Sequence, residues 1–336
     1  MAAVNITFFC PIDLNDVELN SHLANSKNQL FNKLLAIGKH HMINQTMAEL
    51  ICQQFSIQPD PDYPLAALIA FTNPYDNIQY YLQADPVHLI LQRDAVVLSD
   101  PAALIATQEE LQALCQLLNQ HFTEDGFAFE LSECVNSQSK LLLRLNKAPN
   151  INTTLPEKVI GRNIYGYLPQ GEDASYWNKI TNEIQMLLHE HPLNQQRELR
   201  QLPAINSIWL SGGGTLPQVP VSSFNQVISD IPYVQKLAKL AKLDCEPISK
   251  LIKFLPNQQV LIALKPNTDI THWIEILYKL VQQGATLRLN LAHQDVILVT
   301  EIKPIDLYKS WLFKLLGKNK TLTSYFQAHY QRDVLE

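Results

Sequence analysis

The chain has 336 residues, of which 46% are hydrophobic and 17% are charged. This composition excludes extended disorder, and the length is enough for one large α/β domain or two smaller ones, each with its own hydrophobic core. The formal net charge of −6 comes without a basic stripe, so a nucleic-acid-binding surface, which needs clustered Lys and Arg, is not expected.

Five cysteines are scattered along the chain without a CxxC spacing. The sequence therefore predicts neither a zinc knuckle nor a disulfide framework. The first residues lack the basic segment of a signal peptide, and the longest apolar stretch, residues 65–71, is too short to cross a bilayer. We expect a cytoplasmic protein with no membrane partner.

Short strands and helices are predicted in the first part of the chain. Residues 4–9 are β-branched and aromatic, which is typical of a buried strand, and apolar spacings of three and four between residues 28 and 55 predict two helices meeting near Gly38. Thr107 and Glu110 form a capping-box pattern for a helix that continues to residue 121. The other elements expected here are a helix at 62–71, a hairpin at 87–98, and strands at 127–131 and 140–145.

A Pro- and Asn-rich stretch at residues 147–158 interrupts all periodicity and is predicted to be a linker. It separates an N-terminal α/β region with hairpins, residues 1–146, from a C-terminal α/β region, residues 159–317, and a polar tail follows at 318–336. The C-terminal region is expected to contain helices at 173–191, 234–243, 270–283 and 305–316 and strands at 207–210, 260–265, 286–291 and 296–302. This alternation predicts a mixed α/β sheet flanked by helices, with an antiparallel hairpin at its edge.

Candidate ligand-binding side chains gather around a predicted helix end. Pro192 has no amide hydrogen and is expected to stop the preceding helix, which places His191 where unpaired carbonyls favour an imidazolium. Asn194 and Arg197 follow with donors for an anionic or carbonyl group. In the alternative interpretation, His191 and Asn194 satisfy local backbone carbonyls and Arg197 is a solvated charge.

Three glycines follow the strand predicted at 207–210. Gly212, Gly213 and Gly214 would allow a turn of positive φ that exposes successive amides to a phosphate or carboxylate. The sequence has no Lys-Ser/Thr after them, as a P-loop needs, and Pro217 and Pro220 argue against the immediate helix of a dinucleotide fold. A tight turn in which the glycines only permit close packing is the alternative.

Three stretches resemble the RpfE-type family of bacterial proteins: ADPVHL at 84–89, LNQHFTEDGF at 118–127, and NEIQMLLHEHPLNQQRELRQLPAINSIWLSGGG at 182–214. The last stretch is also similar, more distantly, to archaeal-type cofactor-independent phosphoglycerate mutases of the alkaline phosphatase superfamily. The resemblance implies a degenerate alkaline-phosphatase-like (phosphoglycerate-mutase-like) core and a regulatory role. The ligand-binding residues expected with it are His191, Asn194, Arg197, Asn206, Gly212, Gly213 and Gly214. Ser211 departs from the family, in which a Trp is usual.

The mutases that the chain resembles hold two metal ions with Asp and His side chains, because each metal offsets charge on the attacking or leaving oxygen. By this resemblance Lys265 and His272 are vestiges of that site, whereas Thr268 and Trp273 stand at carboxylate positions. No full metal site is expected, and the weak candidates are Asp13, Asp269 and His272. Other acids and histidines are expected to have structural or surface roles: Asp85, His88, His40, His41 and His189.

Three functions stay open. The leading hypothesis is a regulatory or metabolite-binding protein, a catalytically degenerate relative of the mutases, with a small phosphorylated or carboxylated ligand and no cofactor. The second is an active metal-dependent phosphoglycerate mutase or phosphatase, which would need manganese or zinc. The third is a structural protein that binds a protein partner. No catalytic residue is assigned.

Overall fold

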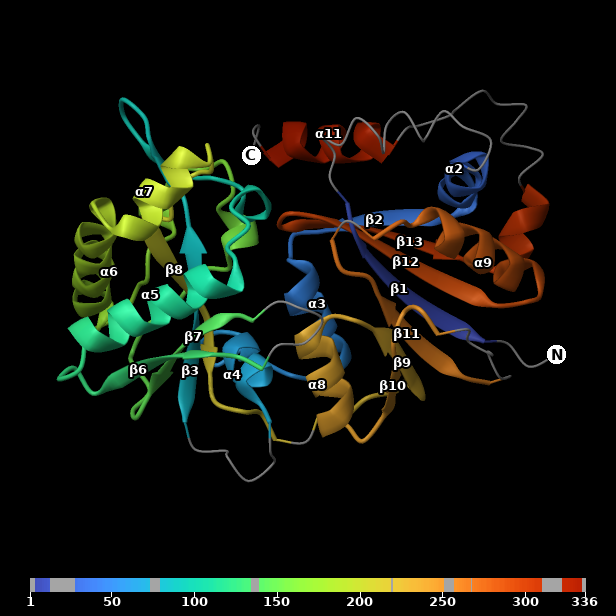
Figure 1. Ribbon diagram of the computed structural model, residues 1–336. Helices are drawn as coiled ribbons and strands as arrows, with labels where there is room; N and C mark the ends of the chain where they lie inside the picture. Colours follow the sequence, from blue (N-terminus) through green and yellow to red (C-terminus); the bar gives the residue numbers. More distant parts are fainter. Residues whose placement is uncertain are drawn as a thin grey trace. The chain divides into compact units, whose positions relative to one another are not determined.

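A computed structural model describes residues 4–12, 28–72, 79–133, 139–218, 220–250, 257–266, 268–309 and 322–333. The chain forms two compact units (Figure 1). Unit 1 comprises Met1–Gln54 and Val221–Glu336, and unit 2 comprises Phe55–Pro220. The second unit is thus a continuous segment inserted into the sequence of the first.

The stretch predicted as a linker, residues 147–158, lies inside unit 2. Ile151 and Leu155 in this stretch are buried, and Asn152 forms a backbone bridge with Gln170. A Pro-rich segment without periodicity can therefore be a packed loop, because two well-placed apolar side chains and a few backbone hydrogen bonds are enough to fix it.

Unit 1 is built on a seven-stranded sheet of order β10-β9-β11-β1-β12-β13-β2. The strands β10, β9, β11, β1 and β12 are parallel, and the pairs β12–β13 and β13–β2 are antiparallel. The strands span Asn5–Pro11 (β1), Lys39–Ile43 (β2), Gln226–Ser229 (β9), Asp244–Glu246 (β10), Gln259–Ala263 (β11), Thr286–His293 (β12) and Val296–Ile302 (β13). The central strands are mostly buried, as expected where a parallel sheet is covered on both faces.

Among the residues that the structure describes, the helices of unit 1 are α2 (Asn28–Ile37), α3 (Met47–Gln54), α8 (Pro232–Leu240), α9 (Thr271–Gln282) and α11 (Leu322–Asp333). The apolar faces of α2 and α9 contribute to one core with β1, β11 and β12. Within the helix predicted at 305–316, the described part is a 3₁₀ turn at Pro304–Lys309, and the remainder lies outside the described residues.

The prediction of two helices meeting near Gly38 is wrong, because β2 separates them. This strand pairs with β13, so the predicted hairpin of β12 and β13 is one strand away from the edge of the sheet. A Cβ at Gly38 would lie 2.3 Å from Thr300 Cγ2, which shows how closely the chain passes β13 at this point. The pairing with a distant strand decides the local structure here, and local periodicity carries no trace of it.

The predicted polar tail contains helix α11. Leu322 and Phe326 of this helix are buried in the core of unit 1, and the ring of Phe326 meets His293 edge-on. Two buried apolar residues four positions apart, with Tyr325 packed beside them, dock this mostly polar helix.

Unit 2 is built on a four-stranded antiparallel sheet of order β6-β7-β3-β8 and a separate two-stranded sheet of β4 and β5. The strands span Tyr80–Val87 (β3), Leu89–Leu91 (β4), Val96–Leu98 (β5), Phe127–Leu131 (β6), Leu141–Leu145 (β7) and Ser207–Gly214 (β8). The helices are α4 (Leu65–Ala70), α5 (Gln108–His121), α6 (Ala174–His189) and α7 (Pro192–Leu199). The apolar faces of α5 and α6 form one core with the larger sheet.

The predicted fold class, a mixed α/β sheet flanked by helices, is confirmed. The predicted hairpin at 87–98 and the capping box of Thr107 and Glu110 are also present. In the described part of the chain no helix combines the length and the apolar character needed to cross a membrane.

Candidate functional site

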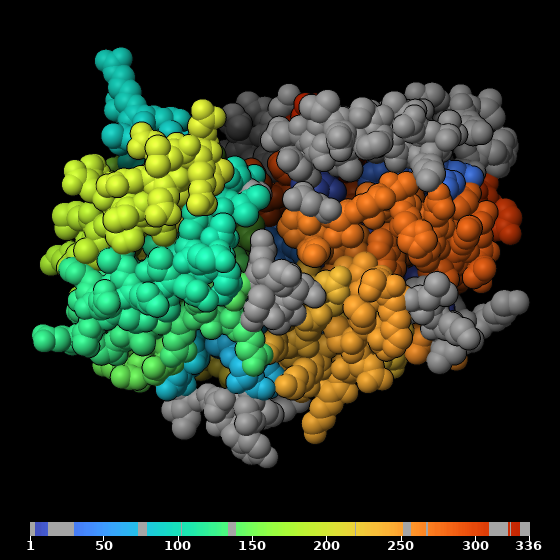
Figure 2. Space-filling view, viewed as in Figure 1, coloured from blue at the N-terminus to red at the C-terminus, as the bar shows by residue number. Residues whose placement is uncertain are grey.

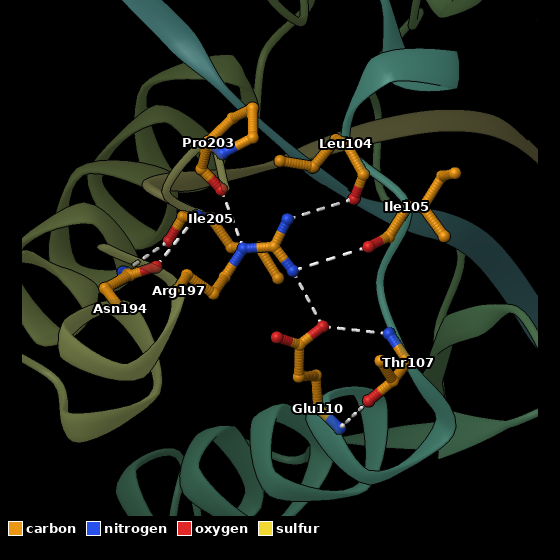
Figure 3. Close-up of polar contacts among 8 residues, drawn as sticks. All are labelled: Leu104, Ile105, Thr107, Glu110, Asn194, Arg197, Pro203 and Ile205. Atoms are coloured by element: carbon orange, nitrogen blue, oxygen red, sulfur yellow. Dashed lines mark hydrogen bonds and ion pairs between the residues drawn. The ribbon is translucent and has the colours of Figure 1, made fainter. Parts of the chain in front are cut away.

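Arg197 is the most deeply buried charged side chain among the predicted site residues, with 1% of its surface exposed. Its Nε donates to the carbonyl of Pro203 at 2.7 Å, and its Nη1 donates to Glu110 Oε2 at 2.7 Å (Figure 3). Longer contacts join Nη1 to Ile105 O (3.4 Å) and Nη2 to Leu104 O (3.3 Å). The interpretation of Arg197 as a solvated charge is wrong. Its guanidinium group is directed at protein acceptors from three separate segments.

Glu110 serves two elements at once. Its Oε2, which meets Arg197, also accepts from the backbone amide of Thr107 at 2.8 Å, while Thr107 Oγ1 accepts from the Glu110 amide at 3.2 Å. The capping box that begins α5 is therefore also the anionic partner of the buried arginine (Figure 3). A buried ion pair is sustained only when further hydrogen bonds satisfy both groups, and here they do.

His191 lies between two helices. α6 ends at His189, and His191 is the N-cap of α7, where its Nδ1 accepts from the amide of Leu193 at 3.3 Å. Pro192 occupies the first position of α7, where a missing amide hydrogen costs nothing. The prediction that His191 lies at the carbonyl end of a helix, where an imidazolium would be favoured, is thus wrong. Its side chain faces the amide end of α7.

The two asparagines of the segment satisfy backbone groups. Asn194 Nδ2 donates to the carbonyls of Leu188 and Ile205, both at 2.8 Å, and its Oδ1 accepts from the Ile205 amide at 2.8 Å. Asn206 Oδ1 accepts from the Leu89 amide at 2.7 Å, and its Nδ2 donates to the Leu89 carbonyl at 2.8 Å. The structural interpretation of Asn194 is confirmed, and Asn206 acts as a substitute strand partner for β4.

The three glycines lie within β8 and are buried, so the prediction of a turn that exposes their amides is wrong. Gly212 has φ +61° where the pairing of β8 with β3 shifts register, which is the conformation of a bulge. A Cβ at Gly213 would lie 2.4 Å from Tyr80 Oη, and a Cβ at Gly214 would lie 2.6 Å from Pro64 Cβ. The glycines allow close packing of β8 against β3 and the start of α4.

Two buried hydroxyls accompany this bulge. Ser211 Oγ and Tyr80 Oη have no hydrogen-bond partner among the described residues. Burial, together with the nearby carboxylates of Asp62 and Asp60, raises the pKa of Tyr80, so its hydroxyl stays neutral.

The predicted metal vestiges belong to unit 1. Lys265, Asp269 and His272 fall between the carboxyl end of β11 and the first turn of α9. The Asp269 carboxylate accepts from the amide of Thr271 at 2.9 Å. Asp13 lies outside the described residues, directly beyond β1.

The residues described do not assemble a metal centre. Among them, no group of three or more His, Cys, Asp or Glu side chains is arranged to hold a metal ion. Of the side chains predicted to be structural, Asp85 forms an ion pair with Lys140 at 2.9 Å, and His88 Nδ1 lies 2.8 Å from the carbonyl of Ala204. His40 and His41 lie in strand β2.

The sheet of unit 1 places two polar residues that the sequence did not single out, Asp230 and His293, at the same edge as Lys265. Asp230 follows β9, Lys265 follows β11 and His293 ends β12, and the three strands are parallel. Ligands of parallel α/β sheets bind at the carboxyl ends of the strands. A polar residue directly after a buried strand is the signal that could have indicated Asp230 and His293.

Sequence comparisons identify one family over part of the chain. The family model of 2,3-bisphosphoglycerate-independent phosphoglycerate mutase matches residues 86–194. A mutase of Methanothrix thermoacetophila is 39% identical over 67 residues, which are 20% of this chain and 17% of that protein. A probable mutase of Geobacter sulfurreducens is 29% identical over 166 residues, 47% of this chain and 40% of that protein. The matches thus cover less than half of either relative.

Two solved structures align with the chain at lower sequence identity. A cofactor-independent phosphoglycerate mutase from Thermoplasma acidophilum aligns over 90% of both chains with a TM-score of 0.41 and 13% identity. A protein of Pyrococcus horikoshii aligns over 90% of this chain and 88% of its own with a TM-score of 0.42 and 12% identity. The sequence matches, centred on residues 86–194, relate this chain to the 2,3-bisphosphoglycerate-independent phosphoglycerate mutases.

Proposed function

We propose that this chain is a phosphoglycerate-mutase-like protein with a regulatory or metabolite-binding role and without mutase turnover. The observation that carries the proposal is the environment of Trp273. By the resemblance to the mutases, Trp273 stands where a carboxylate ligand is expected, and its indole is 5% exposed and packs against Phe8 at 6.0 Å between ring centroids. A core tryptophan cannot supply the hard anionic oxygen that such a site needs.

Thr268, at the second carboxylate position, supports the same proposal. Its Oγ1 donates to the carbonyl of Lys265 at 2.8 Å, so the hydroxyl closes a local turn. A neutral hydroxyl in this position leaves the cationic Lys265 without the carboxylate that the resemblance expects beside it.

A small phosphorylated or carboxylated metabolite is the ligand class that this edge of unit 1 favours. Lys265 and His272 are exposed near the carboxyl end of β11, while the carboxylates of Asp230 and Asp269 accept from backbone amides. A lysine ammonium with few free carboxylates beside it favours an anion over a metal ion. The regulatory part of the proposal rests on the resemblance of residues 84–89, 118–127 and 182–214 to RpfE-type proteins.

Turnover is tested by metal analysis of the purified protein together with a coupled phosphoglycerate mutase assay in added manganese. We expect less than stoichiometric metal and no activity above background, because the carboxylate positions hold Thr268 and Trp273. An active mutase measured in parallel shows that the assay works. Stoichiometric metal with turnover would sink the proposal and favour the active enzyme.

Ligand binding is tested by calorimetric titration with 2- and 3-phosphoglycerate, phosphoenolpyruvate and inorganic phosphate. We expect heat from at least one of these anions, and Lys265→Ala should weaken its binding by about tenfold, the effect of losing one charge-assisted contact. Lys179→Ala, which removes an exposed lysine from α6 of unit 2, is the matched control. No heat with any of the four anions removes metabolite binding and leaves the partner-binding hypothesis.

A further inference from the structure

A two-stranded arm projects from unit 2, formed by β4, β5 and the turn between them, residues 89–98 (Figure 2). Its base is fixed by the side chain of Asn206, which pairs with both backbone groups of Leu89, and by the amide of Gly161, which donates to the Leu98 carbonyl at 2.9 Å. Beyond this base the arm carries exposed aliphatic side chains.

Hairpin tips are usually polar, whereas the exposed side chains of this one include two large aliphatic residues. Leu91 is 83% exposed and Ile90 is 41% exposed, and the turn that follows them contains Arg93 and Asp94. A two-stranded sheet alone is at best marginally stable. The side chains of Ile90 and Leu91 are too exposed to stabilise it by burial. Large exposed apolar groups bounded by charges are characteristic of protein-interaction surfaces.

A hollow on the same unit has a complementary lining. It has a volume of about 760 Å³ and lies where α6 gives way to α7. Its lining residues are Asn182, Gln185, Met186, Leu187, His189, Glu190, His191 and Pro192. Met186 is 72% exposed and, with Leu187 and Pro192, provides an apolar surface, while His189 and Glu190 are exposed at its polar side.

We propose that the arm of one copy of this chain occupies the hollow of a second copy, and that the reverse contact completes a two-fold dimer. The hollow is shallow and open to solvent, and its volume leaves room for the side chains of Ile90 and Leu91. The arm and the hollow both belong to unit 2. Under two-fold symmetry, each copy therefore inserts its arm into the hollow of the other.

Charge complementarity favours a second copy as the occupant. The tip of the arm presents Arg93 and Asp94, and the hollow presents Glu190 and His189. In this arrangement Arg93 of one copy is placed to meet Glu190 of the other at the rim of the apolar contact. Charged groups at the rim of an apolar contact fix its register and exclude other partners.

The dimer is tested by sedimentation velocity of the full chain over a range of concentrations. We expect a monomer–dimer equilibrium, and Leu91→Asp should raise the dimer dissociation constant by about ten- to a hundredfold, the effect of no longer burying a leucine. Val221→Asp, at a position 73% exposed in unit 1, should leave the constant unchanged. Circular dichroism confirms that each variant is folded.

A mixture of two variants distinguishes a contact between arm and hollow from a contact between two arms. Leu91→Asp keeps an intact hollow and Met186→Asp keeps an intact arm, so a mixture of the two should form dimers more readily than either alone. Arg93→Glu should weaken the dimer, and its combination with Glu190→Arg should restore it. The proposal is overturned by any of three results. These are a wild-type chain that is monomeric at all concentrations, a dimer that Leu91→Asp does not weaken, and a mixture of the two variants that does not recover dimers.

Discussion

At the scale of single residues, the segment that resembles the mutases is held by buried polar contacts. Arg197, Asn194 and Asn206 direct their donors at backbone carbonyls, and Glu110 completes the ion pair with Arg197. Side chains that satisfy several backbone groups at once hold irregular chain in a fixed conformation. The donors of Arg197, Asn194 and Asn206 are therefore used within unit 2, where they fix the conformation of this segment.

We predict that Arg197→Met destabilises the protein by about 3–5 kcal/mol, because removing one partner of a buried ion pair leaves the other charge unpaired. Glu110 is the group left behind, with 12% of its side chain exposed. Glu110→Gln should cost less, about 1–2 kcal/mol, since the amide oxygen still accepts from Thr107. Urea denaturation followed by circular dichroism measures both.

Arg200→Met is the control for this prediction, because Arg200 is exposed at the end of the same helix. It should change the free energy of unfolding by no more than about 0.5 kcal/mol. If Arg197→Met and Arg200→Met have equal effects, the contacts of Arg197 do not stabilise the fold.

At the scale of elements, the sequence predicted what local chemistry determines. The helix from Gln108 to His121 follows from its capping box, and the strand at Asn5–Pro11 follows from its β-branched and aromatic run. Strand β2 and the bulge at Gly212 were not predicted, because each is determined by a partner far along the chain. Helical periodicity on either side of Gly38 carried no sign of β13, and three glycines suggest a turn when the strand beside them is unknown.

The residues of the candidate site also separate into those that local sequence could predict and those that depend on remote partners. That Asn194 satisfies backbone carbonyls could be weighed from the sequence, since asparagine commonly does so at helix ends. The burial of Arg197 could not, because it depends on Leu104, Ile105 and Glu110, which are remote in sequence. Lys265 and His272 were found by resemblance. Asp230 and His293 could have been noticed as polar residues at strand ends, but that they share one edge of the sheet follows only from the order of the parallel strands.

At the scale of the whole molecule, the division into units decides which segments can fold by themselves. Unit 2 is one continuous segment with its own apolar core of β3, β7, β8, α5 and α6. Its length is within the usual range of a single domain. Unit 1 combines the two ends of the chain, and its central strand β1 pairs with β11 and β12 from the other end of the sequence.

We therefore predict that a fragment of residues 55–220 folds alone and unfolds cooperatively on heating, as monitored by far-ultraviolet circular dichroism. A fragment of residues 159–317 is the matched comparison, because it corresponds to the boundary that composition suggested. It contains β8 without its partner β3, and β11 and β12 without β1 between them. Strands that lack their neighbours leave backbone groups and apolar faces exposed, so this fragment should show no cooperative transition. If the 159–317 fragment melts cooperatively and the 55–220 fragment does not, the units are not independent folding domains, and the Pro-rich stretch at 147–158 regains its place as the boundary.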